Sequence, residues 1–161
     1  MNTAGRIDTV EDFSILVQQA LVVIVTSYRE KWCPFCRTYL REFDSVRRNP
    51  PRSALLVGIS VDTFDECKEL QKKLKLGYDL IPDETLVMRQ LLKVTTGKGH
   101  GKEAYLQPSV FVFKDGEKCF EWIQEPKLLN LGGAIGRLPV KAIVQKVTDI
   151  SERKDKGINH P

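Results

Sequence analysis

Two cysteines separated by two residues are the part of this sequence best suited to chemistry. Cys33 and Cys36 occur in the segment WCPFC (residues 32–36), whereas the other two cysteines, Cys67 and Cys119, stand alone. Thiols at this spacing are close enough to form a disulfide, and in a reducing compartment such a pair is more often catalytic or metal-binding than structural. The pair therefore indicates either redox chemistry or half of a metal site.

The residues around the pair predict a strand that ends before it and a helix that begins at it. Residues 21–28 (LVVIVTSY) are mostly apolar and β-branched, which is typical of a central strand covered on both faces. Residues 36–48 carry apolar side chains at helical spacing, and Pro34 suits the first turn because its missing N–H would have no partner there. The unpaired N–H groups and the positive dipole end of that turn favour the thiolate of Cys33.

Basic side chains gather near the pair. Arg29, Lys31 and Arg37 flank it and would favour a thiolate further, although Glu30 offsets part of their charge. Residues 28–48 contain six basic and three acidic side chains, so this segment holds +3 of the formal net charge of +4. This charge favours acidic partners more than nucleic acid.

A zinc site is the main structural alternative for the pair. Zinc needs four ligands, but the remaining candidates are scattered without a second paired spacing. These candidates are Cys67, Cys119, His100 and His160. We therefore expect no metal, and no cofactor besides a redox-active disulfide between Cys33 and Cys36.

The rest of the chain alternates helices and strands. Helices are expected over residues 8–19, 64–75, 83–92 and from about 136 or 139 to 149, and strands over 54–61, 78–81, 109–114 and 117–123. The glycine-rich segment 94–107 indicates a mobile loop and lacks phosphate-binding spacing. This order predicts one α/β domain over residues 1–150, with a mixed sheet between helices, and a polar tail over 151–161.

The composition and the termini indicate the compartment. The 161 residues are 42% hydrophobic and 29% charged, as expected for a folded water-soluble protein. Acidic residues precede the first apolar run, unlike in a secretory signal peptide, and the longest apolar run spans only residues 20–25. A membrane-spanning helix needs roughly 20 apolar residues. We therefore expect a cytoplasmic protein that is not bound to a membrane.

Two segments of the chain resemble the thioredoxin superfamily. The strand, the segment WCPFCR (residues 32–37) and the following helix resemble its active site, and residues 107–116 (QPSVFVFKDG) resemble the proline-led strand that faces the redox pair in that fold. The resemblance implies that Gln107 lies against the disulfide and that Pro108 follows a cis peptide bond. It also implies that Trp32, Pro34, Gln107 and Pro108 bind the substrate, with packing beside the active strand as the alternative role for Trp32.

The spacing of these two segments resembles one group within the superfamily. Pro108 lies 75 residues after Cys33, and the interval contains an additional helix, strand and helix. This layout is similar to that of the redoxin and alkyl-hydroperoxide-reductase/thiol-specific-antioxidant group, which includes peroxiredoxins and peroxiredoxin-like proteins with a CxxC site. The resemblance implies a thioredoxin-like fold with a helix-strand-helix insertion before the proline-led strand.

The residues before the cysteines favour disulfide exchange over peroxide reduction. Typical peroxiredoxins carry Pro-x-x-x-Thr/Ser-x-x-Cys, but counting back from Cys36 gives Arg29 and Cys33, and counting back from Cys33 gives Thr26 and Glu30. We therefore predict a thiol-disulfide oxidoreductase acting on protein or small disulfides, with electrons from a thiol donor such as thioredoxin reductase or the glutathione system. A peroxiredoxin-like thiol peroxidase and a non-catalytic protein-binding module remain as alternatives.

The predicted mechanism assigns a place to each thiol. Cys33 attacks the substrate from an exposed loop tip, and Cys36, shielded one turn into the helix, resolves the mixed disulfide. Cys67 and Cys119 are expected to be buried core thiols. Ser27 occupies the position of the buried acid in thioredoxins, so the resemblance implies that another group or water transfers a proton to Cys36.

Overall fold

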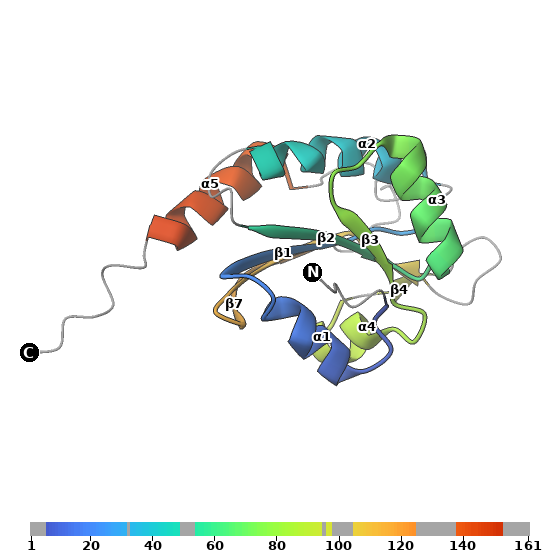
Figure 1. Cartoon of the computed structure of the whole chain (residues 1–161), viewed down its shortest axis with the longest axis horizontal. Coiled ribbons are helices and arrows are strands. Elements are labelled where there is room, and N and C mark those ends of the chain that lie inside the picture. The colour runs from blue at the N-terminus through green and yellow to red at the C-terminus, as the bar shows by residue number, and fades with distance from the viewer. Residues whose placement is uncertain are drawn as a thin grey trace, which may run out of the picture.

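A five-stranded mixed sheet forms the centre of the computed structural model, which describes residues 6–31, 33–48, 54–94, 96–97, 105–124 and 138–152 (Figure 1). In chain order its strands are β1 (Val22–Ser27), β2 (Leu55–Ser60), β3 (Asp79–Pro82), β6 (Ser109–Lys114) and β7 (Glu117–Ile123). Their spatial order is β3-β2-β1-β6-β7, with β1, β2 and β3 parallel and β6 and β7 antiparallel to their neighbours. The carboxyl ends of three strands and the start of β6 therefore meet at one edge of the sheet.

Helices cover both faces of this sheet. They are α1 (Val10–Val17), α2 (Pro34–Phe43), α3 (Phe64–Leu74), α4 (Val87–Leu92) and α5 (Val140–Glu152), and a short 3₁₀ helix, η1 (Asp44–Arg48), extends α2. Helices α2, α3 and α5 lie on one face, and α1 and α4 lie on the other (Figure 1). This arrangement confirms the predicted thioredoxin-like architecture of a mixed sheet flanked by helices.

Strand β1 separates two hydrophobic cores because its successive side chains point to opposite faces. Val22 and Ile24 pack in the core under α2, α3 and α5, whereas Val23 and Val25 pack in the core over α1 and α4. All six residues of β1 are buried. The strand begins with an uninterrupted run of apolar residues because it is buried from both sides.

The expected helices and strands are all present, but two segments differ from the prediction. Helix α4 begins only at Val87 because both carboxylate oxygens of Asp83 accept N–H groups of its first turn, from Val87 at 2.8 Å and Met88 at 3.0 Å. The predicted loop over 94–107 contains two short strands, β4 (Thr96–Gly97) and β5 (Tyr105–Leu106), which pair with each other. His100 and His160 lie outside the described residues, as does the tail beyond residue 152.

No helix in the described part of the chain has the length and apolar character needed to cross a membrane.

Gly58 in β2 lets neighbouring side chains close over the sheet. A Cβ atom at this position would lie 2.5 Å from Leu80 Cδ2, 3.6 Å from Tyr78 Cε2 and 3.7 Å from Leu40 Cδ2. Since Leu40 belongs to α2, the absence of a side chain at residue 58 allows this helix to pack closely on β2.

We predict that Gly58→Ala lowers the free energy of unfolding by about 1–3 kcal/mol, because an added methyl overpacks the core. Urea denaturation followed by circular dichroism measures this change. Gly77→Ala is the control at an exposed position, where a change below about 0.5 kcal/mol is expected. Equal stability of Gly58→Ala and the wild type would contradict the packing argument.

Candidate active site

Cys33 caps the first turn of α2. Its backbone is extended, with φ −73° and ψ 109°, and its sulfur accepts a hydrogen bond from the N–H of Cys36 at 3.3 Å. The carbonyl of Cys33 accepts the N–H of Arg37 at 3.1 Å, and Pro34 occupies the first helical position. The sulfur thus receives an N–H group of the first turn that would otherwise have no partner.

The two thiols of the pair are both buried, so the expected exposed tip at Cys33 is wrong. Cys33 is 1% exposed and Cys36 is 0% exposed. The loop after β1 folds inward, because the N–H of Cys33 bonds to the carbonyl of Glu30 at 3.1 Å and Glu30 is itself buried. The exposed part of the motif is Pro34 and Phe35, and the Phe35 side chain is 51% exposed.

The three basic residues near the pair each engage a different neighbour. The Arg29 guanidinium is buried and lies over the Tyr105 ring, with 4.1 Å from Cζ to the ring centroid. The Lys31 ammonium lies 3.6 Å from a Glu66 carboxylate oxygen, and Arg37 Nε donates a hydrogen bond to the Lys31 carbonyl at 2.6 Å. Their predicted effect on the Cys33 thiolate stays a prediction.

Gln107 and Pro108 lie at the same end of β1 from which the Cys33 loop departs. The hydroxyl of Ser27, the last residue of β1, donates a hydrogen bond to the Gln107 carbonyl at 2.7 Å, and the Pro108 carbonyl accepts the N–H of Gln124 at 2.9 Å. The structure therefore brings the two segments of the thioredoxin resemblance to one sheet edge. The substrate-binding role of both residues stays a prediction, and Trp32 lies outside the described residues.

Cys67 is a core thiol, as predicted. It is 0% exposed, its sulfur lies 3.8 Å from the Tyr28 hydroxyl and 3.9 Å from the Ser60 hydroxyl, and it donates to the Asp62 carbonyl at 3.9 Å. Burial raises the pKa of this thiol to about 11, with the nearby Asp62 carboxylate acting in the same direction. Cys67 is therefore neutral at physiological pH and poorly suited to nucleophilic attack.

Cys119 is exposed, so its predicted place in the core is wrong. The register between β6 and β7 shifts at this point, because Val112 pairs with Phe120 while Phe113 pairs with Lys118. Cys119 is the extra residue of this bulge, on a strand that forms the edge of the sheet. A bulge breaks the alternation of inward and outward side chains, and the local sequence does not reveal where this happens.

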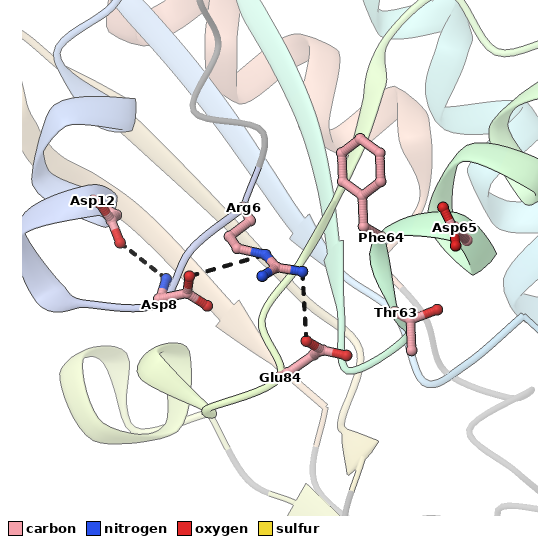
Figure 2. A pocket seen from close by; sticks show the side chains of 7 residues that line it. All are labelled: Arg6, Asp8, Asp12, Thr63, Phe64, Asp65 and Glu84. Carbon is pink, nitrogen blue, oxygen red and sulfur yellow. Dashed lines mark hydrogen bonds and ion pairs between the residues drawn. The ribbon is translucent and has the colours of Figure 1, made fainter.

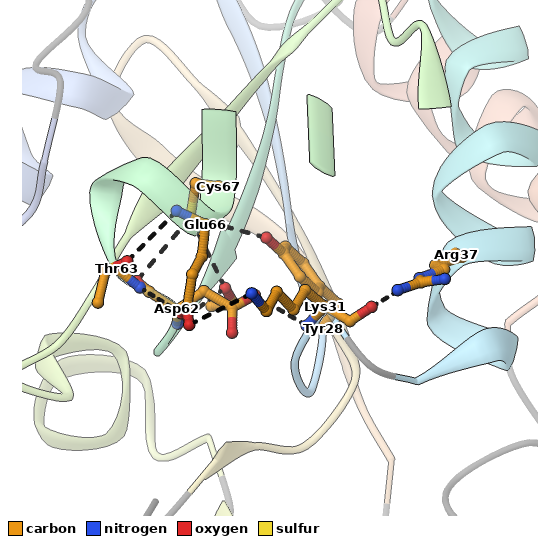
Figure 3. Close-up of polar contacts among 8 residues, drawn as sticks. Tyr28, Lys31, Arg37, Asp62, Thr63, Glu66 and Cys67 are labelled. Atoms are coloured by element: carbon orange, nitrogen blue, oxygen red, sulfur yellow. Dashed lines mark hydrogen bonds and ion pairs between the residues drawn. The ribbon is translucent and has the colours of Figure 1, made fainter. Parts of the chain in front are cut away.

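Asp62 is a residue near the site whose role the sequence analysis missed. It follows β2, is 1% exposed, and one of its carboxylate oxygens accepts the N–H of Lys31 at 2.9 Å (Figure 3). A signal for it existed, because an acidic residue directly after a buried strand parallel to β1 must lie at the same sheet edge as the Cys33 loop.

A second feature of this edge is a cavity of about 860 Å³ beside the starts of α1 and α3 (Figure 2). Its lining residues are Arg6, Asp8, Asp12, Thr63, Phe64, Asp65 and Glu84. The Arg6 guanidinium lies 3.9 Å from both the Asp8 and the Glu84 carboxylates. Within the described part of the chain, none of the predicted site residues lines this cavity.

Within the described residues, no group of three or more His, Cys, Asp and Glu side chains is arranged to hold a metal ion. Of the four cysteines, Cys33, Cys36 and Cys67 are buried and Cys119 is exposed.

Residues 4–119 match the model of the AhpC/TSA family. The chain belongs to this family. The match includes the candidate thiol pair and both segments of the thioredoxin resemblance, and it confirms the predicted redoxin group. Members of this family use cysteine redox chemistry without a cofactor, and the assignment supports peroxide reduction better than disulfide exchange. No curated protein sequence matches the chain.

Solved peroxiredoxin structures share the fold of this AhpC/TSA protein. A mutant of peroxiredoxin 6 from Arenicola marina superposes with a TM-score of 0.71 at 15% identity, over 92% of this chain and 69% of that chain. AhpC from Enterococcus faecalis superposes with a TM-score of 0.71 at 14% identity, over 91% of this chain and 84% of that chain. The peroxidoxin BcpB from Mycobacterium tuberculosis superposes with a TM-score of 0.65 at 16% identity, over 88% of this chain and 84% of that chain.

We predict that Cys119 in the folded protein reacts with iodoacetamide near pH 8 and that Cys67 does not. Exposure leaves the Cys119 thiol accessible, whereas a rise in the pKa of Cys67 from 9.0 to about 11 lowers its thiolate fraction about a hundredfold even before burial hinders the reagent. Peptide mass spectrometry measures both modifications. After unfolding in urea the two thiols should react alike, and rapid modification of Cys67 in the folded chain would refute its assignment to the core.

Proposed function

We propose that this AhpC/TSA protein is a thiol peroxidase in which Cys33 is the attacking thiol and Cys36 the resolving thiol. The burial of Cys33, at 1% exposure, carries this proposal. An oxidant as small as hydrogen peroxide needs only a slight displacement of the loop to reach a sulfur in such a place, whereas the disulfide of a folded protein would need the loop to open widely. Family membership supports the same chemistry.

The start of α2 supplies the conditions for the first step. The Cys36 N–H stabilises a thiolate at Cys33, which attacks one peroxide oxygen and breaks the O–O bond. Cys33 is oxidised to the sulfenic acid, and the other oxygen leaves as water or an alcohol after taking up a proton. Since the Pro-x-x-x-Thr pattern is missing, the Cys36 N–H, which lies against the Cys33 sulfur, is the donor we assign to the developing negative charge.

The following steps return the pair to its reduced form. The Cys36 thiol attacks the Cys33 sulfenic acid, releasing water and forming the Cys33–Cys36 disulfide. Two thiol groups of an electron donor then reduce this disulfide and leave as the donor's own disulfide. We assign the donor to a thiol system of a reducing compartment such as the cytoplasm. Its first contact is the exposed Pro34, and because Gln107 and Pro108 are buried, they meet the donor only after the Cys33 loop opens.

Thiol-disulfide exchange is a second candidate, favoured by one observation. Phe35, between the two cysteines, is 51% exposed beside the exposed Pro34. An exposed aromatic ring next to a thiol pair is a suitable contact for a protein disulfide substrate. Under this hypothesis, insulin disulfide reduction would exceed peroxide consumption.

We predict that Cys33→Ser reduces peroxide consumption, with dithiothreitol as donor, to the rate of dithiothreitol alone, because the attacking thiol is lost. Cys36→Ser should still form the Cys33 sulfenic acid, detectable with dimedone by mass spectrometry, but should not form the intramolecular disulfide. Cys119→Ser is the matched control, since its thiol is exposed on the edge strand, and it should keep wild-type turnover. Full peroxide consumption by Cys33→Ser would refute the proposed function.

A further inference from the structure

Lys31, two residues before Cys33, is held at three points by three different parts of the fold (Figure 3). Its N–H donates to the Asp62 carboxylate at 2.9 Å, its carbonyl accepts from Arg37 Nε at 2.6 Å, and its ammonium lies 3.6 Å from Glu66. Asp62 follows β2, Arg37 belongs to α2 and Glu66 belongs to α3. The short loop that carries the attacking thiol is thus tied to elements on both of its sides.

Two of these three contacts, those of Asp62 and Arg37, bind the backbone of residue 31, and Asp62 is the more deeply buried partner. The Asp62 side chain is buried, and a hydrogen bond to a buried carboxylate is stronger than one between neutral groups. It binds the backbone of residue 31, so it fixes the course of the chain directly. The Lys31–Glu66 pair is weaker because its side chains are 42% and 27% exposed.

Asp62 is itself held rigidly. Its N–H donates to the Ser60 hydroxyl at 3.2 Å, and the next residue, Thr63, caps α3 through a reciprocal pair of hydrogen bonds with Glu66, at 2.9 and 3.3 Å. The carboxylate therefore projects from the ordered junction of a central strand and a helix. A group mounted in this way can determine the position of a loop, since its own position is set by regular structure.

We propose that Asp62 is a positioning residue that keeps Cys33 buried and thereby makes the site selective for small oxidants over bulky disulfides. The inference rests on the proposed function, in which Cys33 is the attacking thiol. A bulky reagent reaches Cys33 only after the loop opens, and opening breaks the bond between Lys31 and Asp62. A small reagent needs a smaller displacement of the loop, in which the Cys36 N–H can stay on the Cys33 sulfur.

The experiment compares two reagents on the Cys33 thiol. Iodoacetamide is the small reagent and dithiobis(nitrobenzoate), an aromatic disulfide, is the bulky one. Their rates are measured in a Cys36→Ser, Cys119→Ser protein, which keeps the residue-36 N–H and leaves Cys67 as the remaining thiol besides Cys33. Cys67 does not compete because it is buried with a raised pKa.

We predict that Asp62→Ala increases the ratio of the bulky to the small reagent rate about tenfold or more, because losing a hydrogen bond to a charged group makes loop opening easier by at least about that factor. Asp62→Asn should increase the ratio about fivefold, since its amide oxygen still accepts the Lys31 N–H without the charge. Lys31→Met should change the ratio less than about twofold, because it removes only the partly exposed ion pair.

Asp83→Asn is the matched control. Asp83 is also a fully buried carboxylate after a parallel strand, and it also accepts backbone N–H groups, but those of α4 instead of the Cys33 loop. It should leave the ratio unchanged, whatever its effect on stability. If a global loss of stability caused the shift, the ratio of the two reagent rates would rise in Asp83→Asn as well. The positioning role predicts a rise in the Asp62 variants and none in Asp83→Asn.

The outcomes separate this inference from the proposed function. An unchanged ratio in folded Asp62→Asn, or an equal change in Asp83→Asn, would overturn the positioning role, and Asp62→Asn decides the matter if Asp62→Ala fails to fold by circular dichroism. A shifted ratio in a protein whose wild type consumes no peroxide would refute the peroxidase proposal and leave the positioning role intact. If the wild type consumes peroxide and the ratio is unshifted in the Asp62 variants, the peroxidase proposal stands and the positioning role is refuted.

Discussion

The hydrogen bond between the Cys36 N–H and the Cys33 sulfur is the interaction on which the site depends, and β1 determines where it forms. This strand is buried on both faces and paired on both edges, with β2 on one side and β6 on the other. Its end is therefore one of the most constrained points of the fold. Cys33, six residues beyond the last residue of β1, can therefore be held against a helix start by a short loop.

The parallel arrangement of β1 with β2 supplies the second half of the site. Strands that run in the same direction deliver the segments after them to the same sheet edge, which brings Asp62 to the loop before Cys33. The antiparallel β6 begins at this edge as well, so Gln107 and Pro108 arrive there from a distant part of the chain. The directions of the strands thus bring three segments that are far apart in the sequence, namely the Cys33 loop, Asp62 and residues 107–108, to one edge of the sheet.

Two thiols lie elsewhere than the sequence predicted, for different physical reasons. Cys33 is buried because hydrogen bonds from the loop backbone to Glu30 and Asp62 fold the loop inward, and side-chain patterns do not record backbone hydrogen bonds. Cys119 is exposed because an added residue in an edge strand changes the side on which it lies. Cys67, by contrast, could be placed from helical periodicity, since its neighbours Leu70 and Leu74 share its buried face.

The sequence by itself determined the order of helices and strands, the junction at which the thiol pair lies, and the similarity to the redoxin group. These properties depend on residues close together in the chain, such as the apolar run of β1 and the proline after Cys33. Only the tertiary structure decided how accessible each thiol is, which carboxylate holds the Cys33 loop, and where β7 bulges. Each of these depends on contacts between residues far apart in the sequence, such as Lys31 with Asp62, and their geometry exists only once the sheet has formed.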